Sequence, residues 1–226
     1  TDDTGYTATQ VIGIVVTPVN DAPTVSTALT DQTATEDSAF SLTLPANTFA
    51  DIDGDALTLS ATLADGSALP TWLTFNAETQ VFSGTPLNDD VGTLSVTVTA
   101  MDTVGESVSD TFDIVIANTN DAPTTANVQV SASEDTVATV TLLASDIDVG
   151  DAIESFTITS LPNNGSLYFD SELTTSVSLN YVITASSNTA TLYFKPDTHW
   201  FGETAFTFNA TDGEATTADA TVTVSI

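Results

Sequence analysis

Aspartate residues recur at alternate positions in two short segments of this sequence. The first segment, ADIDGD, carries Asp51, Asp53 and Asp55, and the second, SDIDVGD, carries Asp146 and Asp148. Residues i and i+2 of an extended strand point to the same side, so we expect the carboxylates of each segment to lie together. Two like charges about 4 Å apart repel by roughly 1 kcal/mol even in bulk water. Ca²⁺ relieves such repulsion, because it takes six to eight oxygen ligands in the irregular geometry that loops supply.

An EF-hand loop does not explain either segment. Such a loop needs a bidentate Glu at its twelfth position, whereas Thr62 and Thr157 stand at that position in loops that begin at Asp51 and Asp146. A single Asp-rich segment is also open to interpretation as a solvated turn, because Asp favours turns for its own hydrogen bonding. A metal site here must therefore be completed by residues that are remote in sequence.

The Asp-rich segments belong to a larger repeat. VNDAPTV at 19–25 recurs as TNDAPTT at 119–125. Aligning these copies also aligns TATEDSAF with SASEDTVA, the two Asp-rich segments with each other, and TAMDTVG with NATDGEA. The order of the motifs is shared, although the segments between them differ in length. Repetition in order at the spacing of a domain indicates two related units and favours a joint role for the acidic motifs.

Short runs that alternate between apolar and polar residues must position these motifs. ALTLSATL at 56–63, TLSVTVTA at 93–100, TFDIVIA at 111–117 and ATVTVSI at 220–226 have the period of half-buried strands. Turn signals such as DGD, DGS, NNG and TDGE separate the strands at short intervals, which suits antiparallel sandwiches. We therefore predict an all-β fold of two tandem Greek-key β-sandwiches.

The repeat divides the chain into three parts. The offset between the two tetrads sets DDTGYTATQVIGIVV beside DTVGESVSDTFDIVI, so we interpret residues 1–18 as the terminal strand of a preceding repeat. Residues 19–118 are the predicted first domain and residues 119–226 the predicted second domain. We expect the chain to be a piece of a tandem array.

The charge balance excludes several classes of partner. The sequence has 31 acidic residues and one basic residue, Lys195, which gives a net charge of -30. Such a charge repels phosphate backbones and anionic lipid headgroups, so we expect no binding to nucleic acid. The apolar run VIGIVV is too short to span a bilayer, so we expect no direct membrane insertion. Cysteine is absent, which excludes disulfides and thiolate chemistry.

No arrangement typical of a catalytic nucleophile is present. His199 is the single histidine, and no second histidine or cysteine accompanies it. Carboxylates are so numerous that two of them at a spacing suited to glycoside hydrolysis would carry no information. We therefore predict that the protein is not an enzyme. Trp200 is a candidate for stacking on a sugar or peptide, on the premise that Phe201 packs inward and strand alternation places Trp200 outside.

Taken together, the motifs resemble those of the cadherin repeat. Its linker motif D-x-N-D-N is similar to NTND at 118–121, its early Glu to Glu36, and its late A-x-D to Asp102 and Asp212. Its D-R-E motif is echoed in NAETQVFSG, with Asn at one acidic position. LPTWLTFNAETQVFSGTP is similar to the dystroglycan-type cadherin-like domain, and ATLYFKPDTHWFGETAFTFNATDG resembles the cadherin-like repeats of large bacterial surface adhesins.

The resemblance implies that Ca²⁺ binds at a linker between the two sandwiches. The ligands implied for this joint are Glu36, Glu78, Asn118, Asn120, Asp121, Asp146, Asp148 and Asp212. Those implied for an upstream joint are Asn20, Asp21, Asp51, Asp53 and Asp102. We expect the upstream site to be weaker, because the Glu ligands of a preceding domain are not in this sequence.

The same resemblance implies a function. It points to a calcium-rigidified extender or adhesion module of a bacterial surface adhesin, at the cell surface or outside the cell. Neighbouring repeats of the same chain are then its partners. The alternative is a module of the same adhesin type that binds a cell-surface carbohydrate or a peptide.

Overall fold

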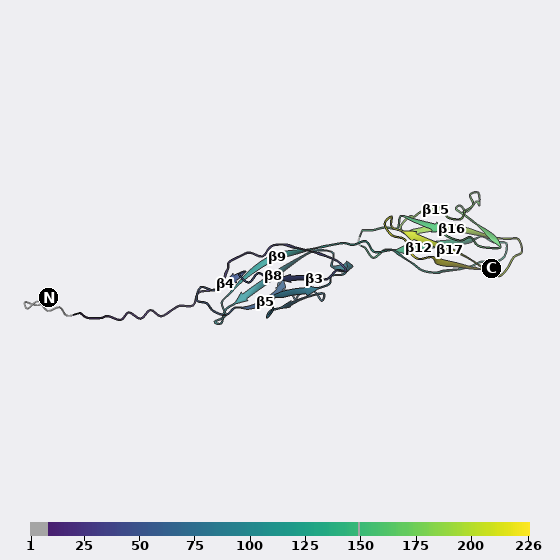
Figure 1. The fold of residues 1–226 in the computed structure, drawn as a ribbon. Coiled ribbons are helices and arrows are strands. Elements are labelled where there is room, and N and C mark those ends of the chain that lie inside the picture. The colour runs from purple at the N-terminus through teal and green to yellow at the C-terminus, as the bar shows by residue number, and fades with distance from the viewer. Residues whose placement is uncertain (1–8, 149) are drawn as a thin grey trace, which may run out of the picture. The chain divides into compact units, whose positions relative to one another are not determined.

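The computed structural model describes residues 9–148 and 150–226 (Figure 1). The chain forms two compact units, and each is described by itself. The first unit consists of the chain up to Ala34 with Ser38–Thr85 and Gly92–Ile116, and the second of Thr35–Asp37, Pro86–Val91 and Ala117–Ile226. Two short segments, 35–37 and 86–91, thus belong to the second unit although the chain on both sides of them belongs to the first.

The all-β prediction is confirmed, and the two units are tandem β-sandwiches. The strands up to the linker are β1 (Thr24–Val25), β2 (Gln32–Thr35), β3 (Phe40–Thr43), β4 (Phe49–Ala50), β5 (Thr58–Leu63), β6 (Leu73–Asn76), β7 (Val81–Gly84), β8 (Gly92–Met101) and β9 (Ser107–Ala117). The strands after the linker are β10 (Thr124–Thr125), β11 (Val128–Ser131), β12 (Ala138–Ser145), β13 (Ser155–Ile158), β14 (Gly165–Tyr168), β15 (Val182–Thr184), β16 (Thr189–Pro196), β17 (Glu203–Thr211) and β18 (Ala220–Ser225). A short 3₁₀ helix, η1 (Asn88–Asp90), lies in the segment 86–91.

The core of the first unit lies between two sheets. One sheet has the strand order β2-β9-β8-β5 and the other β3-β7-β6, while β1 pairs with β4. Alternate residues of β8 and β9, such as Val96 and Ile114, are fully buried and face this core. The ring of Phe112 on β9 meets that of Phe82 on β7 edge to face, with 5.8 Å between the ring centroids. The core thus joins the two layers directly.

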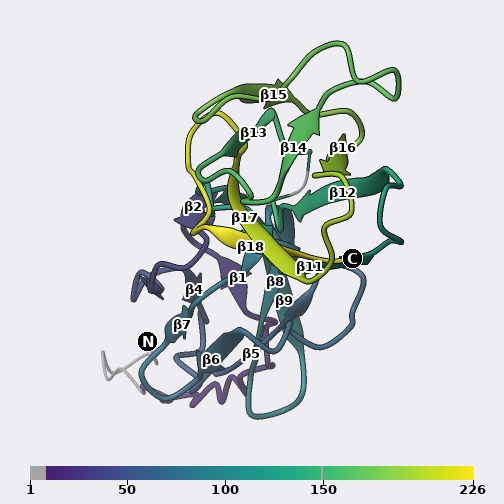
Figure 2. The same ribbon diagram turned by 90° about the vertical axis from the view of Figure 1, so that its right-hand side faces the viewer.

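The second unit has a larger core between its own two sheets. Their strand orders are β10-β12-β16-β14 and β11-β18-β17-β13-β15, and the neighbouring β17 and β18 can be followed in Figure 2. Alternation is regular along β12, where Val140 and Leu142 are fully buried and the threonines between them are exposed. On the facing sheet Phe206 and Phe208 of β17 are buried. Strand β11 runs parallel to β18, and the other pairings in this unit are antiparallel.

The strand expected within residues 1–18 is not formed in the described part of the chain. Residues 1–8 lie outside the described residues, and residues 9–23 contain no strand. The side chains of Ile12, Ile14 and Val16, which correspond in the repeat to core residues of β9, are exposed. A strand forms only where a neighbouring strand can accept its hydrogen bonds, and none pairs with this segment.

Across the residues that are described, no helix combines the length and hydropathy needed to cross a bilayer.

Candidate metal centre

Each copy of the Asn-Asp-Ala-Pro tetrad is tied to the sandwich that follows it. In the first copy the side-chain amide of Asn20 donates to Oδ2 of Asp102 over 2.9 Å. The backbone N–H of Asp21 donates to Oδ2 of Asp53 over 2.8 Å. The proline of this tetrad, Pro23, is buried. Two hydrogen bonds and a buried ring thus fix the tetrad to the Asp-rich segment and to the late Asp.

The second copy makes the same contacts. The amide of Asn120 donates to Oδ2 of Asp212 over 3.2 Å, and the backbone N–H of Asp121 donates to Oδ2 of Asp148 over 2.7 Å. Pro123 is buried in its turn. The repeat found in the sequence is therefore a repeat of one local structure, in which linker, Asp-rich segment and late Asp meet.

The Asp-rich segment of the first unit is a turn, so our expectation of an extended strand with alternate carboxylates on one side was wrong. Gly54 has a φ of +81°, a left-handed conformation that glycine adopts readily, and its N–H donates to the carbonyl of Asp51 over 3.3 Å. Oδ1 of Asp51 accepts hydrogen bonds from the backbone N–H groups of Asp53 and Asp55, over 2.8 and 3.3 Å. The turn brings residues four apart together, instead of residues two apart.

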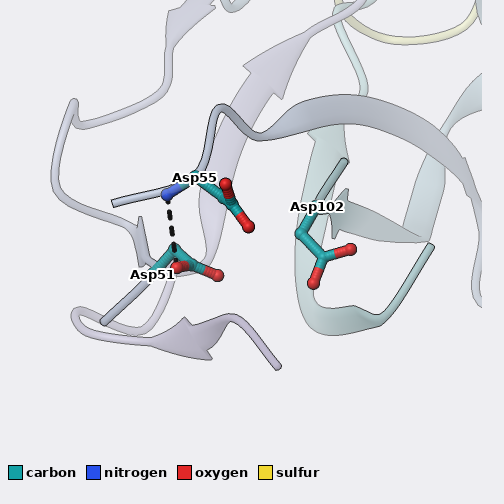
Figure 3. A group of neighbouring side chains, drawn as sticks. All are labelled: Asp51, Asp55 and Asp102. Carbon is teal, nitrogen blue, oxygen red and sulfur yellow. Dashed lines mark hydrogen bonds between the residues drawn. The ribbon is translucent and has the colours of Figure 1, made fainter. Parts of the chain in front are cut away.

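Three carboxylates converge as a result (Figure 3). Asp51, Asp55 and Asp102 each offer an oxygen, and these three oxygens lie within 4.8 Å of one another. Asp102 follows the end of β8 and is only 4% exposed. Asp55 was not among the ligands that we inferred, although its signal was visible as the third Asp of ADIDGD. The carboxylate of Asp53, which we did infer, instead accepts the N–H of Asp21, and its role as a ligand stays a prediction.

The two late carboxylates are held in their ionised form. A hydrogen bond from the Asn20 amide, with others from the N–H groups of residues 104–106, holds the pKa of Asp102 below its usual value. Burial acts to raise the pKa of Asp212, but hydrogen bonds from the N–H groups of Ala215 and Glu214 and from the Asn120 amide lower it by more. Both groups thus favour the charged form that a cation requires.

Three buried carboxylate oxygens have no hydrogen-bond partner. They are Oε2 of Glu36, Oδ2 of Asp51 and Oδ2 of Asp146. Glu36 as a whole is 1% exposed, and the chain has no arginine and a single lysine, Lys195, whose side chain is exposed on β16. A buried charged oxygen without a partner is costly, and carboxylate oxygens are the donors that a hard cation takes. The donor set therefore fits Ca²⁺.

Glu36 is held beside the linker within the second unit. Its Oε1 accepts the backbone N–H of Thr119 over 2.5 Å, and its own N–H donates to the carbonyl of Ala117 over 3.1 Å. The N–H of Asp37 donates to the carbonyl of Pro86 over 2.9 Å. The segments 35–37 and 86–91 are thus joined to each other and to residues 117–119 by backbone contacts.

Asn88 of η1 also belongs to this group, and it was missed in the sequence. Its side-chain amide donates to Oδ2 of Asp121 over 2.8 Å and to Oδ1 of Asp148 over 3.1 Å. Asp148 is 4% exposed, so the second of these contacts is well shielded from water. Asp90 accepts the N–H of Leu87 and closes the turn that presents Asn88. The signal was the acidic turn LNDD before β8, which resembles the other Asp-rich turns.

Two further ligands inferred from the resemblance are exposed. Glu78 lies in the first unit, in a turn where Oδ1 of Asn76 accepts the N–H groups of Glu78 and Thr79 over 2.9 and 3.0 Å. Asn118 lies in the linker of the second unit. The place of both residues among the ligands stays a prediction.

The premise for a stacking role of Trp200 is wrong. Phe201 is 77% exposed and Trp200 is half-buried, the reverse of the orientation that we expected. Strand alternation does not apply here, because β17 begins only at Glu203 and His199 has a left-handed φ of +59°. His199 is exposed, as expected, but it pairs with Asp135, with 3.1 Å between Nδ1 and Oδ2.

Comparison with known proteins identifies the two sandwiches. Residues 22–117 match a family described as "Putative Ig domain", and residues 120–225 match one described as "Bacterial Ig domain". The chain is a tandem of immunoglobulin-like repeats. Domains of these two families are typically non-catalytic, which agrees with the expectation that the protein is not an enzyme. They also fit an extracellular or surface-associated location.

Solved structures support the fold of these repeats. The extracellular domains 3–6 of protocadherin gamma B2 are 13% identical to this chain, with a TM-score of 0.53, over 90% of this chain and 47% of that one. An endo-fucoidan hydrolase of glycoside hydrolase family 107 is 21% identical, with a TM-score of 0.40, over 93% of this chain and 29% of that one. The human desmocollin-1 ectodomain is 15% identical, with a TM-score of 0.46, over 93% of this chain and 37% of that one. No curated protein matches the sequence.

Proposed function

We propose that these tandem repeats are a calcium-rigidified extender or adhesion module of a bacterial surface adhesin. The observation that carries the proposal is Glu36, a carboxylate that is 1% exposed and has one oxygen without any partner. A protein with one lysine and no arginine cannot neutralise this group internally. A divalent cation from outside can, and it would turn a costly buried charge into a ligand.

The proposed ion of the second unit is bound by the two orphaned oxygens and their neighbours. Glu36 and Asp146 supply oxygens that accept no hydrogen bond. Asp121, Asp148 and Asp212 lie in the same hydrogen-bonded group through the linker tetrad. Asn118, Asn120 and Glu78 remain candidates from the resemblance to cadherin repeats.

A second ion is proposed in the first unit, at Asp51, Asp55 and Asp102. Their oxygens lie within 4.8 Å of one another, and Oδ2 of Asp51 is buried without a partner. Three carboxylates supply fewer oxygens than Ca²⁺ usually takes, so water or the remaining candidates Asn20, Asp21 and Asp53 complete the shell. We expect this site to be the weaker one.

The proposed effect of calcium is mechanical. The segments 35–37 and 86–91 interrupt the chain of the first unit, so an ion that binds them together with the linker restricts the angle between the two units. Extracellular modules of this kind bind Ca²⁺ with Kd values of about 10⁻⁴ to 10⁻³ M. The module would therefore be stiff outside the cell, with neighbouring repeats of the same chain as its partners. Within this proposal the first domain is of the dystroglycan type.

The test is a calcium titration of the whole chain by isothermal calorimetry, with small-angle scattering in calcium and in chelator. We expect calcium uptake in the submillimolar to millimolar range and a narrower distribution of interdomain distances when the ion is bound. Heat changes indistinguishable from dilution, together with the same scattering curve in both buffers, would refute the proposal.

One observation favours the alternative function, a carbohydrate- or peptide-binding module. Phe201 is a large aromatic side chain at 77% exposure, beside the half-buried Trp200. An exposed ring can stack on a sugar face or on an apolar peptide side chain. A glycan array and a peptide screen with wild-type protein and Phe201→Ala would test it. Equal signals from the two proteins would exclude this ring as the contact.

A further inference from the structure

The two acidic groups differ in one respect. In the first unit three carboxylate oxygens converge within 4.8 Å, whereas no such triad occurs among the described residues of the second unit. The linker tetrads make the same two hydrogen bonds in both units, so the tetrads do not account for the difference. What distinguishes the second group is the amide of Asn88, which lies between Asp121 and Asp148.

The orientation of this amide follows from chemistry. Ionised carboxylates only accept hydrogen bonds, so the NH₂ group of Asn88, and not its oxygen, must face both partners. The two protons of that NH₂ group serve the two carboxylates, over 2.8 and 3.1 Å. In the described part of the first unit, no side chain donates to both Asp21 and Asp53, the counterparts of Asp121 and Asp148.

We propose that Asn88 replaces one cation in the second unit, by bridging Asp121 and Asp148 with its amide. The inference rests on the proposed function, in which the remaining oxygens of this group bind Ca²⁺. It assigns Asn88 as a positioning residue that holds the segment 86–91 against the linker when no ion is bound. The site then takes one ion fewer than its carboxylates could hold.

The orphaned oxygens are consistent with this division. Glu36 Oε2 and Asp146 Oδ2 have no partner, while the oxygens of Asp121 and Asp148 that face Asn88 are both occupied. An ion at Glu36 and Asp146 therefore need not displace the amide. Hydrogen bonds from Asn88 and a metal ion at the other oxygens can coexist.

The substitution Asn88→Asp tests the proposal, because it keeps the shape of the side chain and exchanges the bridging donor for a third carboxylate. We expect calorimetric titration of the full chain to give one more Ca²⁺ per molecule in this variant than in wild type. Asn209→Asp is the matched control, since Asn209 donates to a single carboxylate, Asp219, on β17 away from the site. The control should bind the same number of ions as wild type.

A metal-free measurement separates this inference from the proposed function. Hydrogen exchange of the amides in 86–91, followed in chelator, should be at least tenfold faster in Asn88→Ala than in wild type. The calcium titration of wild type tests the proposed function alone. Unchanged exchange in Asn88→Ala, or an unchanged ion count in Asn88→Asp where wild type binds calcium, would overturn the role of Asn88.

Discussion

Substituting Glu36 by Gln should change the stability of the second unit in opposite directions with and without calcium. Glu36 is buried and its Oε2 has no partner, while its Oε1 accepts the N–H of Thr119. Glutamine has nearly the same shape and keeps an acceptor for that N–H. What it removes is one buried negative charge.

The magnitude in chelator follows from the cost of that charge. A buried polar group without a partner costs about 1 to 3 kcal/mol, and more when it is charged. We therefore expect Glu36→Gln to stabilise the metal-free second unit by at least about 1 kcal/mol. For a unit of this size the corresponding rise in Tm is about 4 °C. The usual result of altering a buried residue is a loss of stability, so the sign itself is diagnostic.

The magnitude in calcium follows from linkage. At a calcium concentration 100 times Kd, binding stabilises the folded state by about 2.7 kcal/mol. If the loss of a charged ligand weakens affinity tenfold, about 1.4 kcal/mol of that gain disappears. The rise in Tm on adding calcium should therefore be about 5 °C smaller in the variant than in wild type.

The assay is differential scanning calorimetry of both proteins in chelator and in saturating calcium. Glu134→Gln is the control, because Glu134 occupies the corresponding place in the second repeat but is exposed, and it should behave as wild type in both buffers. A Glu36→Gln protein that is less stable than wild type in chelator would refute the reasoning, since the carboxylate would then be compensated by the protein itself.

The remaining predictions concern the first site, the joint and acid stability. Asp55→Asn should weaken calcium binding to the first unit about tenfold in calorimetry, because one of three converging carboxylates loses its charge; an unchanged titration would exclude Asp55 as a ligand. The double substitution Asp146→Ala, Asp148→Ala should broaden the interdomain distances seen by small-angle scattering and leave the first unit folded by circular dichroism; an unaltered scattering curve would show that these are not the ligands. Hydrogen bonds from the backbone N–H groups of 174–175 hold the pKa of Asp170 below its usual value. This stabilisation is complete above the unfolded value of about 3.9 and is lost as the pH falls through the folded pKa. The Tm of Asp170→Asn should therefore decline less steeply than that of wild type below about pH 4, and parallel declines would contradict it.

Strand alternation predicted the architecture well, because it reports directly on which residues face a core. The runs at 93–100 and 111–117 became β8 and β9, with every second residue buried. The same logic failed where the backbone leaves the extended conformation. Gly54 turns the Asp-rich segment and brings Asp55 into the group, while the left-handed His199 precedes the pair whose orientation we reversed.

Contacts between segments remote in sequence were harder to foresee. Nothing in the local pattern of LNDD states that Asn88 lies beside Asp121 and Asp148, because that proximity depends on where the second unit gathers its segments. The resemblance to cadherin repeats pointed to the acidic motifs but assigned the role of an early-turn ligand to Glu78, which lies in the first unit and is exposed.

The linker tetrad has a role that needs no metal. The amides of Asn20 and Asn120 and the backbone N–H groups of Asp21 and Asp121 attach each linker copy to the sandwich that follows it. These four donors are satisfied by carboxylates alone, so this side of the linker is ordered whether or not an ion is present. On the other side the contacts end at Glu36, whose second oxygen is left without a partner. Calcium is therefore required only where Glu36 meets the linker, and its removal should release the segments 35–37 and 86–91 before it disturbs either sandwich.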